Sequence, residues 1–247
     1  MNVLLLIGAG LLAGTMNAIA GGGSFVSFPA LVFAGVPSVA ANESSTVALF
    51  PGTLTSAWAY RHYLRGFGGV SLRALLIVSL AGGLLGAVLL LVTPQATFDA
   101  VIPWLLLLAT LALGFGREVG AALRRVAHIR PGPVLLIQFV LAIYGGYFGG
   151  AVGIMMMAAW SLLDSADLKA MSPARVLLVS ATNTIAVICF IVAGAVRWPE
   201  TLVMLVAAAV GGYAGARLAL RMHPRLIRTV ILLFTTAMTI VFFLRAP

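Results

Sequence analysis

The stretch "NAIAGGGSFVSFP", residues 17–29, places three consecutive glycines between two apolar runs. Each run has the composition of a membrane helix, but glycine is a poor residue inside a helix. The stretch therefore predicts that one helix ends and another begins within an apolar region. Non-helical backbone at membrane depth is tolerated only where protein or a water-filled cavity satisfies its polar groups.

The composition of the whole chain agrees with a membrane environment. Of its 247 residues, 62% are hydrophobic and 9% are charged, and the mean hydropathy is +1.13. A soluble domain of this size cannot bury that much apolar surface. Apolar stretches of about 18 or more residues recur, which is the length that a bilayer requires, and no alternating strand pattern recurs. The sequence thus predicts an all-α integral membrane protein.

The ionisable and sulfur-containing residues exclude several functions. The formal charge of +9 lies in short loops, so it predicts membrane topology and not a nucleic-acid partner. The single cysteine, Cys189, excludes an internal disulfide, and the three histidines lie in basic loops, so no metal or cofactor is expected. Residues 1–20 lack the basic start of a secretory signal and are expected to form a helix.

The two halves of the chain share residues in the same order, which predicts an internal duplication. At an offset of 129 or 130 residues, the matches are Gly23 with Gly153, Thr53 with Thr182, Thr55 with Thr184, and Gly82, Gly83 and Gly86 with Gly211, Gly212 and Gly215. Repeat 1, residues 1–116, is expected to contain helices at about 2–20, 24–35, 38–64, 70–93 and 99–116. A cytoplasmic basic linker, 117–131, precedes repeat 2, residues 132–247, with helices at about 132–148, 151–164, 172–196, 200–221 and 226–244. Ser38 and Ser172 are predicted helix N-caps.

The loop charges predict that the two repeats are inverted in the membrane. Of the 15 Lys and Arg residues, all except Arg197 and Arg245 fall in segments that the positive-inside rule assigns to the cytoplasm. The loop after the third helix is then cytoplasmic in repeat 1 and external in repeat 2. The sequence predicts a polytopic helix bundle of two inverted-topology repeats, with extracytoplasmic termini and a cytoplasmic linker at 117–131. It leaves open whether each glycine-broken helical hairpin crosses the membrane fully or turns back.

Inverted repeats with interrupted helices are typical of secondary transporters, whose sites lie near the bilayer midplane. A helix that begins inside the membrane presents free N–H groups and a positive dipole end, and both favour an anion. Glycine also lets a ligand approach the backbone closely. The candidate substrate-binding residues at the two glycine breaks and on the third helix of each repeat are Asn17, Gly21, Gly22, Gly23, Ser24, Ser27, Thr46, Gly149, Gly150, Gly153, Ser180, Thr182 and Asn183.

Three further residues are candidates for coupling or gating. Pro51 interrupts the third apolar run, Glu43 is an acid that lies within that run, and Arg175 lies near the start of the equivalent helix. Structural alternatives remain open. Glu43 and Arg175 can extend to the membrane interface, Ser and Thr can bond their own helix backbone, and glycines spaced by four residues can serve helix packing.

The chain resembles the TauE/SafE family of membrane permeases over nearly its whole length. The stretch "GTMNAIAGGGSFVSFPALVFAGVPSVAANESSTVALFPG", residues 14–52, is similar to the first signature of that family. The stretches "YGGYFGGAVGIMMMAAWSLLD", residues 144–164, and "SATNT", residues 180–184, resemble its second copy, except that Ala159 stands where the first copy has Pro29. The resemblance implies transport of sulfur-containing anions such as sulfite or a sulfonate.

The sequence and the resemblance together predict a secondary transporter that exports a small sulfur-containing anion across the bacterial cytoplasmic (inner) membrane. The expected partners are the anion, the lipid bilayer and a coupling proton or sodium ion, and no oligomeric state is assigned. Two alternatives remain, namely a channel or uptake permease for another small solute, and a non-transporting membrane protein. An enzyme is not expected, because no nucleophile with a base or metal ligand set lies in the apolar runs.

Overall fold

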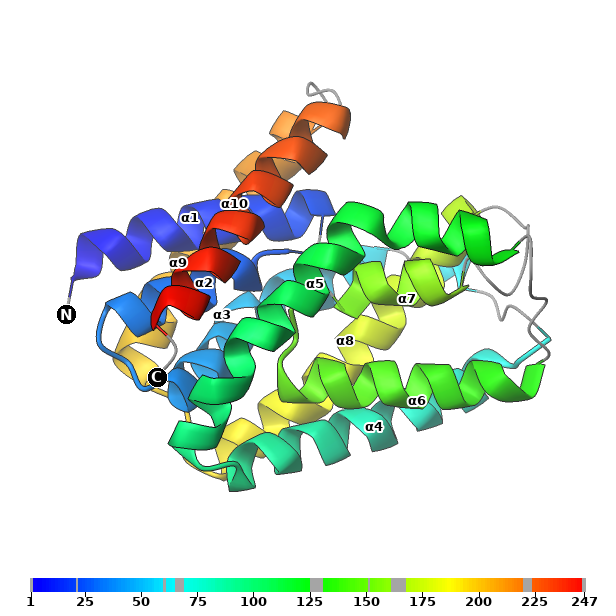
Figure 1. Ribbon diagram of the computed structural model, residues 1–247, viewed down its shortest axis with the longest axis horizontal. Coiled ribbons are helices and arrows are strands. Elements are labelled where there is room, and N and C mark those ends of the chain that lie inside the picture. Colours follow the sequence, from blue (N-terminus) through cyan, green and yellow to red (C-terminus); the bar gives the residue numbers. More distant parts are fainter. Residues whose placement is uncertain are drawn as a thin grey trace.

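The computed structural model describes residues 2–20, 22–59, 61–64, 69–124, 131–150, 152–160, 168–219 and 224–245. These ranges form an all-α bundle together with a short 3-10 helix, Arg61–Tyr63 (Figure 1). The α-helices are α1 (Val3–Ala20), α2 (Ser24–Phe33), α3 (Ser38–Ala59), α4 (Leu72–Val92), α5 (Gln95–Arg124), α6 (Pro131–Tyr147), α7 (Val152–Trp160), α8 (Leu168–Val192), α9 (Trp198–Ala219) and α10 (Pro224–Arg245).

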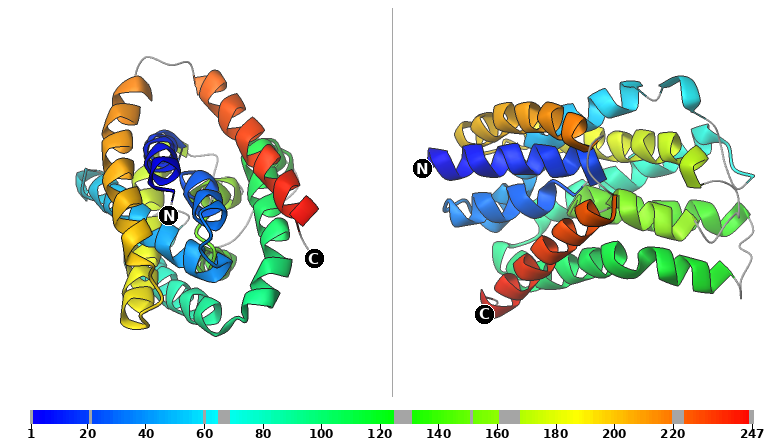
Figure 2. Two further views of the ribbon diagram at one scale, coloured as in Figure 1. Left: turned by 90° about the vertical axis from the view of Figure 1, so that its left-hand side faces the viewer. Right: turned by 90° about the horizontal axis from the view of Figure 1, so that it is seen from above.

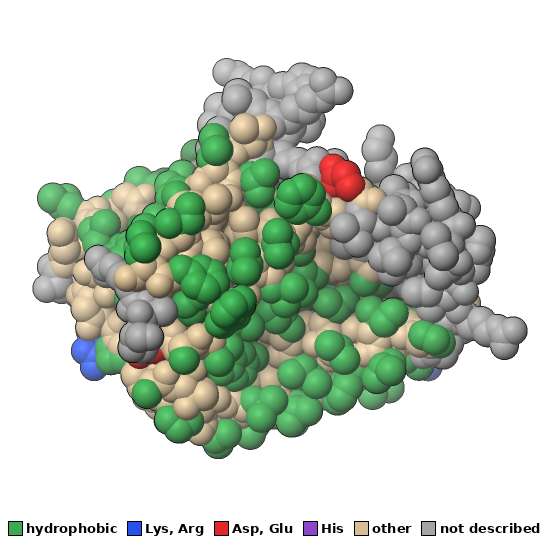
Figure 3. Space-filling model, viewed as in Figure 1, with side chains coloured by type: hydrophobic (Ala, Val, Ile, Leu, Met, Phe, Trp, Pro, Cys, Tyr) green, Lys and Arg blue, Asp and Glu red, His purple; other side chains and the backbone are tan. Residues whose placement is uncertain are grey.

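Three helical segments in the described ranges are long and apolar enough to cross a membrane: Leu72–Val92, Gln95–Gly116 and Pro173–Val192. Shorter apolar helices are Val3–Ala18, Ser24–Phe33, Pro133–Tyr147, Trp198–Ala214 and Leu232–Leu244. Hydrophobic side chains are spread over the described part of the face in Figure 3, and the charged side chains drawn in colour lie near its margins. A surface of this kind suits contact with lipid, so the molecule is an all-α, multi-pass membrane protein.

Several helix boundaries differ from the sequence prediction, and two of the differences change a predicted role. α5 continues to Arg124, so the first part of the predicted linker is helical, because its Ala, Leu and Arg residues are strong helix formers. α8 begins at Leu168, so Ser172 lies inside the helix and its predicted N-cap role is wrong. The Ser38 hydroxyl also caps no backbone N–H but donates to Asp99 at the start of α5. The remaining part of the linker, residues 125–130, lies outside the described residues.

Glycines bring two helix pairs into close contact. Between α1 and α9, a Cβ at Gly14 would collide with the carbonyl of Ala208, and one at Gly211 with the carbonyl of Leu11. Between α4 and α6, a Cβ at Gly86 would likewise collide with the carbonyl of Ile143. Small residues of this kind let helix backbones approach, as in membrane helix packing generally. The packing alternative is therefore confirmed for Gly86 and Gly211.

Each half of the chain contains one short helix that follows a glycine break. α2 has 10 residues and α7 has 9, which corresponds to about 15 Å and 14 Å at 1.5 Å per residue. Both are shorter than the roughly 30 Å hydrocarbon core of a bilayer. In Figure 1, α2 extends toward the end of the molecule that carries both termini, and α7 extends toward the opposite end. The two breaks thus lie in the interior of the bundle.

The orientation of α3 and α8 follows from their contacts. The start of α3 packs on the start of α5, where Ser38 contacts Asp99. Further along α3, Ser44 accepts a hydrogen bond of 3.0 Å from the backbone N–H of Arg197, just beyond the end of α8. α3 and α8 therefore run in opposite directions. α3 starts, and α8 ends, at the end of the molecule where the two termini lie (Figures 1 and 2).

Candidate functional site

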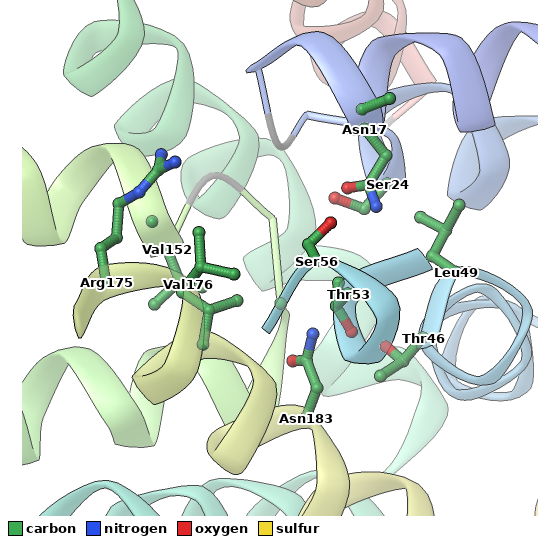
Figure 4. A pocket seen from close by; sticks show the side chains of 14 residues that line it. Asn17, Ser24, Thr46, Leu49, Thr53, Ser56, Val152, Arg175, Val176 and Asn183 are labelled. Carbon is green, nitrogen blue, oxygen red and sulfur yellow. The ribbon is translucent and has the colours of Figure 1, made fainter. Parts of the chain in front are cut away.

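A cavity of about 260 Å³ lies between the two glycine breaks and the facing walls of α3 and α8 (Figure 4). Its walls come from α1, α2, α3, α7 and α8 together with the turn between α6 and α7. The lining residues are Asn17, Ala18, Ser24, Thr46, Leu49, Thr53, Ser56, Gly149, Val152, Gly153, Arg175, Val176, Val179 and Asn183.

The lining is rich in hydrogen-bond donors and carries positive charge. Arg175 is the charged side chain among the described lining residues, and none of them is acidic. In Figure 4, Asn17 and Ser24 lie across the cavity from Arg175, and Asn183 lies below them. A guanidinium offers five N–H donors and a carboxamide offers two, so the arrangement suits a small anion.

Asn183 is a buried lining residue with an unpaired side-chain oxygen. It is 9% exposed, and its Oδ1 atom has no hydrogen-bond partner. Its amide nitrogen points into the cavity (Figure 4). Buried polar atoms are normally hydrogen-bonded, so an unpaired group beside a cavity indicates a site for a ligand or water. By contrast, the hydroxyls of Thr182 and Thr184 donate to the backbone of their own helix, at 2.9 Å and 2.7 Å.

The α3 wall is a single helix face. Thr46, Leu49, Thr53 and Ser56 follow one another at spacings of three or four residues, which places them on one side of a helix. In the structure, the hydroxyls of Thr46, Thr53 and Ser56 donate to carbonyls of α3 at 2.8–2.9 Å. A hydroxyl has one proton to donate, so these groups must rotate away from the helix to donate to a ligand.

Helix starts also face the cavity. Ser24 is the first residue of α2, and Val152 and Gly153 are the first two residues of α7. Gly153 and Arg175 are neighbours in the cavity wall, because a Cβ on Gly153 would lie 3.6 Å from Arg175 Nη1, at ordinary contact distance. Gly149 has φ +75°, a left-handed conformation that favours glycine, and it ends α6 at the cavity wall. Two helix N-termini therefore add positive dipole ends to the charge of Arg175.

The cavity is closed at one end and partly exposed at the other. Along α3, residues 41–45 are buried and Thr46 is half-buried, whereas Thr53 and Ser56 are half-buried with two exposed residues between them. Along α8, Arg175 and Val176 are half-buried, whereas Asn183 is buried and the following Ala186 and Phe190 belong to the core. The closed end thus faces the termini.

The structure gathers seven of the predicted site residues around this cavity. They are Asn17, Ser24, Thr46, Gly149, Gly153, Arg175 and Asn183. The predicted glycine breaks of both halves and the third helix of each half thus meet at one place. Gly21 lies outside the described residues.

The other predicted binding residues serve local structure and do not line the cavity. Gly22 and Gly23 accept backbone hydrogen bonds from the first turn of α2, at 3.2 Å from Phe25 and 3.0 Å from Val26. Ser27 is fully buried and bonds Ser45 at 2.6 Å. A Cβ at Gly150 would approach the Phe148 ring at 2.6 Å, and Ser180 and Thr182 are buried in α8 away from the lining.

Two of the predicted coupling or gating residues also lie apart from the cavity lining. Glu43 is 2% exposed, and its carboxyl group makes no hydrogen bond within the described residues. Pro51 lies inside α3, which continues through it to Ala59. Glu43 is therefore buried in the bundle.

Sequence reasoning missed several lining residues, namely Ala18, Leu49, Thr53, Ser56, Val152, Val176 and Val179. The three on α3 follow from Thr46 by helical spacing, so periodicity could have identified them. The valines carry no polar signal, and only the packing of α7 against α8 places them at the cavity.

Comparison with known proteins gives a family. The family model described as "Sulfite exporter TauE/SafE" matches residues 6–242. A "Probable membrane transporter protein" of Haemophilus influenzae is 29% identical over 241 residues, covering 95% of this chain and 92% of that protein. The "Probable membrane transporter protein YfcA" of Escherichia coli strain K12 is 26% identical over 231 residues, covering 93% and 85%. No solved structure matches the chain significantly.

The family match extends from α1 to α10 and therefore includes every element that contributes to the cavity. Both relatives are named as probable membrane transporters, and the similarity covers 92% and 85% of their lengths. The chain accordingly belongs to the TauE/SafE family, and it is a membrane transporter and not an enzyme.

Proposed function

We propose that the protein exports a small sulfur-containing anion, sulfite or a sulfonate, across the bacterial cytoplasmic membrane and binds it in the cavity between α3 and α8. The donor-rich lining carries this proposal. Arg175 supplies a positive charge, the carboxamides of Asn17 and Asn183 supply donors, and no acid lies among the described lining residues. A charge-assisted pair between a guanidinium and an oxyanion is among the stronger hydrogen-bonded contacts.

The size of the cavity supports a small substrate. Its volume of about 260 Å³ is below the roughly 300–1,000 Å³ of pockets that hold drug-sized ligands. The apolar groups of Val152 and Val176 lie on the same side as Arg175. They can contact the short carbon chain of a sulfonate, while sulfite needs no such contact.

The membrane potential supports the direction of export. A monovalent anion that leaves a cell with a negative interior gains about 2.3 kcal/mol per 100 mV. Uptake of the same anion would need a coupled ion. Glu43 is the proposed coupling group, since it is a buried carboxyl in α3, three residues before Thr46 of the cavity wall.

Efflux from proteoliposomes tests the proposal. Vesicles containing purified protein are loaded with sulfite, sulfoacetate, sulfate or chloride, and efflux is followed under an imposed potential. We expect saturable, potential-sensitive efflux of a sulfur oxyanion, and Arg175→Gln should lower its initial rate at least tenfold. Arg73→Gln, at an exposed position in α4, serves as the charge-matched control and should transport normally.

The same experiment separates the alternatives. Flux that does not saturate would indicate a channel, and flux of neutral solutes or uptake against the potential would indicate a different permease. Equal efflux by the Arg175→Gln and Arg73→Gln variants would place the anion site elsewhere.

A further inference from the structure

One hydrogen bond joins the two halves of the chain at the buried end of the cavity. Asn42 lies one helical turn before Thr46 on α3 and is 2% exposed. Its Nδ2 donates to the backbone carbonyl of Tyr147, the last residue of α6, at 2.9 Å. Because the two residues belong to different halves of the chain, this bond joins the third helix of the first half to the glycine break of the second.

The bond positions groups that line the cavity. Thr46 Oγ1 donates to the carbonyl of Asn42 at 2.9 Å. A Cβ built on Gly149 would lie 3.6 Å from the same Thr46 oxygen, so the two cavity walls meet there. Separation of α3 from the α6–α7 turn at this point would open the cavity toward the termini.

Aromatic side chains from both halves surround the same contact. Phe28 of α2 meets Phe148 with ring centroids 5.9 Å apart, and Phe98 of α5 meets Tyr147 at 5.7 Å. Edge-to-face pairs of this kind add to the burial of the rings. Nothing comparable covers the other end of the cavity among the described residues, where Ser56, Arg175 and Val176 are half-buried.

We propose that the hydrogen bond from Asn42 to Tyr147 is the latch of a gate on the terminal side of the cavity, and that the structure is the state open toward the opposite side. Replacing Asn42 leaves the buried carbonyl of Tyr147 without its hydrogen-bond donor. The variant should therefore shift toward the state in which water hydrates this carbonyl. Asn42 acts here as a positioning residue and does not contact the substrate. The inference rests on the proposed transport function, but its test needs no substrate.

Sided labelling tests the latch. The native cysteine, Cys189, does not line the cavity and is first removed by Cys189→Ala. In this background, Thr53→Cys places a single thiol on the cavity wall. A membrane-impermeant maleimide is applied to each side of oriented vesicles. With Asn42 present, we expect labelling from the side opposite the termini and little from the terminal side. Asn42→Leu, which keeps the shape but not the donor, should raise the terminal-side labelling rate at least tenfold.

Ser45→Ala is the matched control. It removes a hydrogen bond of 2.6 Å on the same helix, but the partner, Ser27, belongs to the same half of the chain. This variant should label like the parent. If Asn42→Leu does not fold, Asn42→Ser is used, because a serine side chain is too short to span the same gap.

The outcomes separate the latch from the proposed substrate. Unchanged labelling in folded Asn42 variants, or rapid terminal-side labelling of the parent, would overturn the latch even if anions are transported. A labelling shift without flux of any sulfur anion would support the latch and reject the proposed substrate.

Discussion

At the residue scale, the cavity depends on a few polar groups that the fold leaves incompletely paired. Asn183 is buried with an unpaired Oδ1, whereas its neighbours Thr182 and Thr184 satisfy their own hydroxyls within α8. An unpaired buried polar atom costs stability, while the amide nitrogen of the same side chain points into the cavity, where it can donate to an anion (Figure 4). Stability and function should therefore respond in opposite directions at this position.

The first prediction concerns Asn183→Leu. Removing the unpaired amide should leave the thermal stability of the purified protein unchanged or raise it by a few degrees, since about 1–3 kcal/mol of unsatisfied polar burial disappears. Anion efflux should fall at least fivefold, because a donor is lost from the cavity wall. Thermal unfolding in detergent and efflux are measured on the same preparation. A variant that transports normally, or that unfolds well below the parent, would contradict the assigned role.

The second prediction concerns Glu43→Gln. Glutamine keeps the size of the buried side chain but cannot release a proton. Flux driven by an imposed pH gradient should fall at least tenfold, while anion exchange at equal pH on both sides continues. Asn42 and Ser44, which flank Glu43, hold α3 in place through Tyr147 and Arg197, so the helix should keep its position. Equal stimulation of parent and variant by the pH gradient would reject proton coupling through Glu43.

At the scale of the elements, glycine has two separate uses in this molecule. Within α1, α4 and α9 it permits close packing, since a Cβ at Gly14, Gly86 or Gly211 would collide with a neighbouring backbone carbonyl. Between α6 and α7, Gly149 adopts a left-handed φ and ends a helix beside the cavity. The first use stabilises the bundle, and the second shapes the site.

The third prediction compares two glycines of α1. Gly14→Ala should lower the melting temperature by several degrees, because α1 must move away from α9 to accommodate the Cβ and overpacking typically costs about 1–3 kcal/mol. Gly8→Ala is the control, since a Cβ there would meet nothing within 4 Å. Alanine is also the better helix former, so Gly8→Ala should be neutral or stabilising. Equal melting temperatures would show that the α1–α9 contact is looser than described.

At the scale of the whole molecule, the packing partners repeat with a shift of five helices. α1 packs on α9 and α6 on α4, and α3 packs on α9 as α8 does on α4. The hydroxyls of Thr110 and Thr239 lie 3.0 Å apart and are separated by 129 residues, the offset that relates the two halves in sequence. A residue that contacts its own counterpart lies on a twofold axis, so this pair supports the proposed inverted repeats.

The fourth prediction concerns topology. If the repeats are inverted, both termini lie on one side of the membrane and the segment between α5 and α6 on the other, and the loop charges assign that segment to the cytoplasm. A reporter that is active only in the periplasm should function when fused to the C-terminus and fail when inserted at residues 125–130, and a cytoplasmic fluorescent reporter should give the opposite result. The described structure places both termini at one end of the molecule (Figure 2). The reverse reporter pattern would overturn the orientation but not the fold.

The sequence alone determined the helical membrane fold, the approximate helix positions, the family and several polar residues that line the cavity. These properties follow from local composition, because a bilayer imposes a length and an apolar character on each helix separately. Two of the boundaries that were predicted wrongly, the end of α5 and the start of α8, lie where helix formers continue beyond the apolar region.

Only the tertiary structure decided which polar residues share a cavity and which serve packing. Ser27 and Ser24 belong to the same glycine break, yet one bonds Ser45 in the core and the other lines the cavity. The contact of Asn42 with Tyr147, 105 positions away, is likewise absent from any local pattern. Helical periodicity specifies the face on which a side chain lies, but the partner of that face depends on contacts between distant segments of the chain.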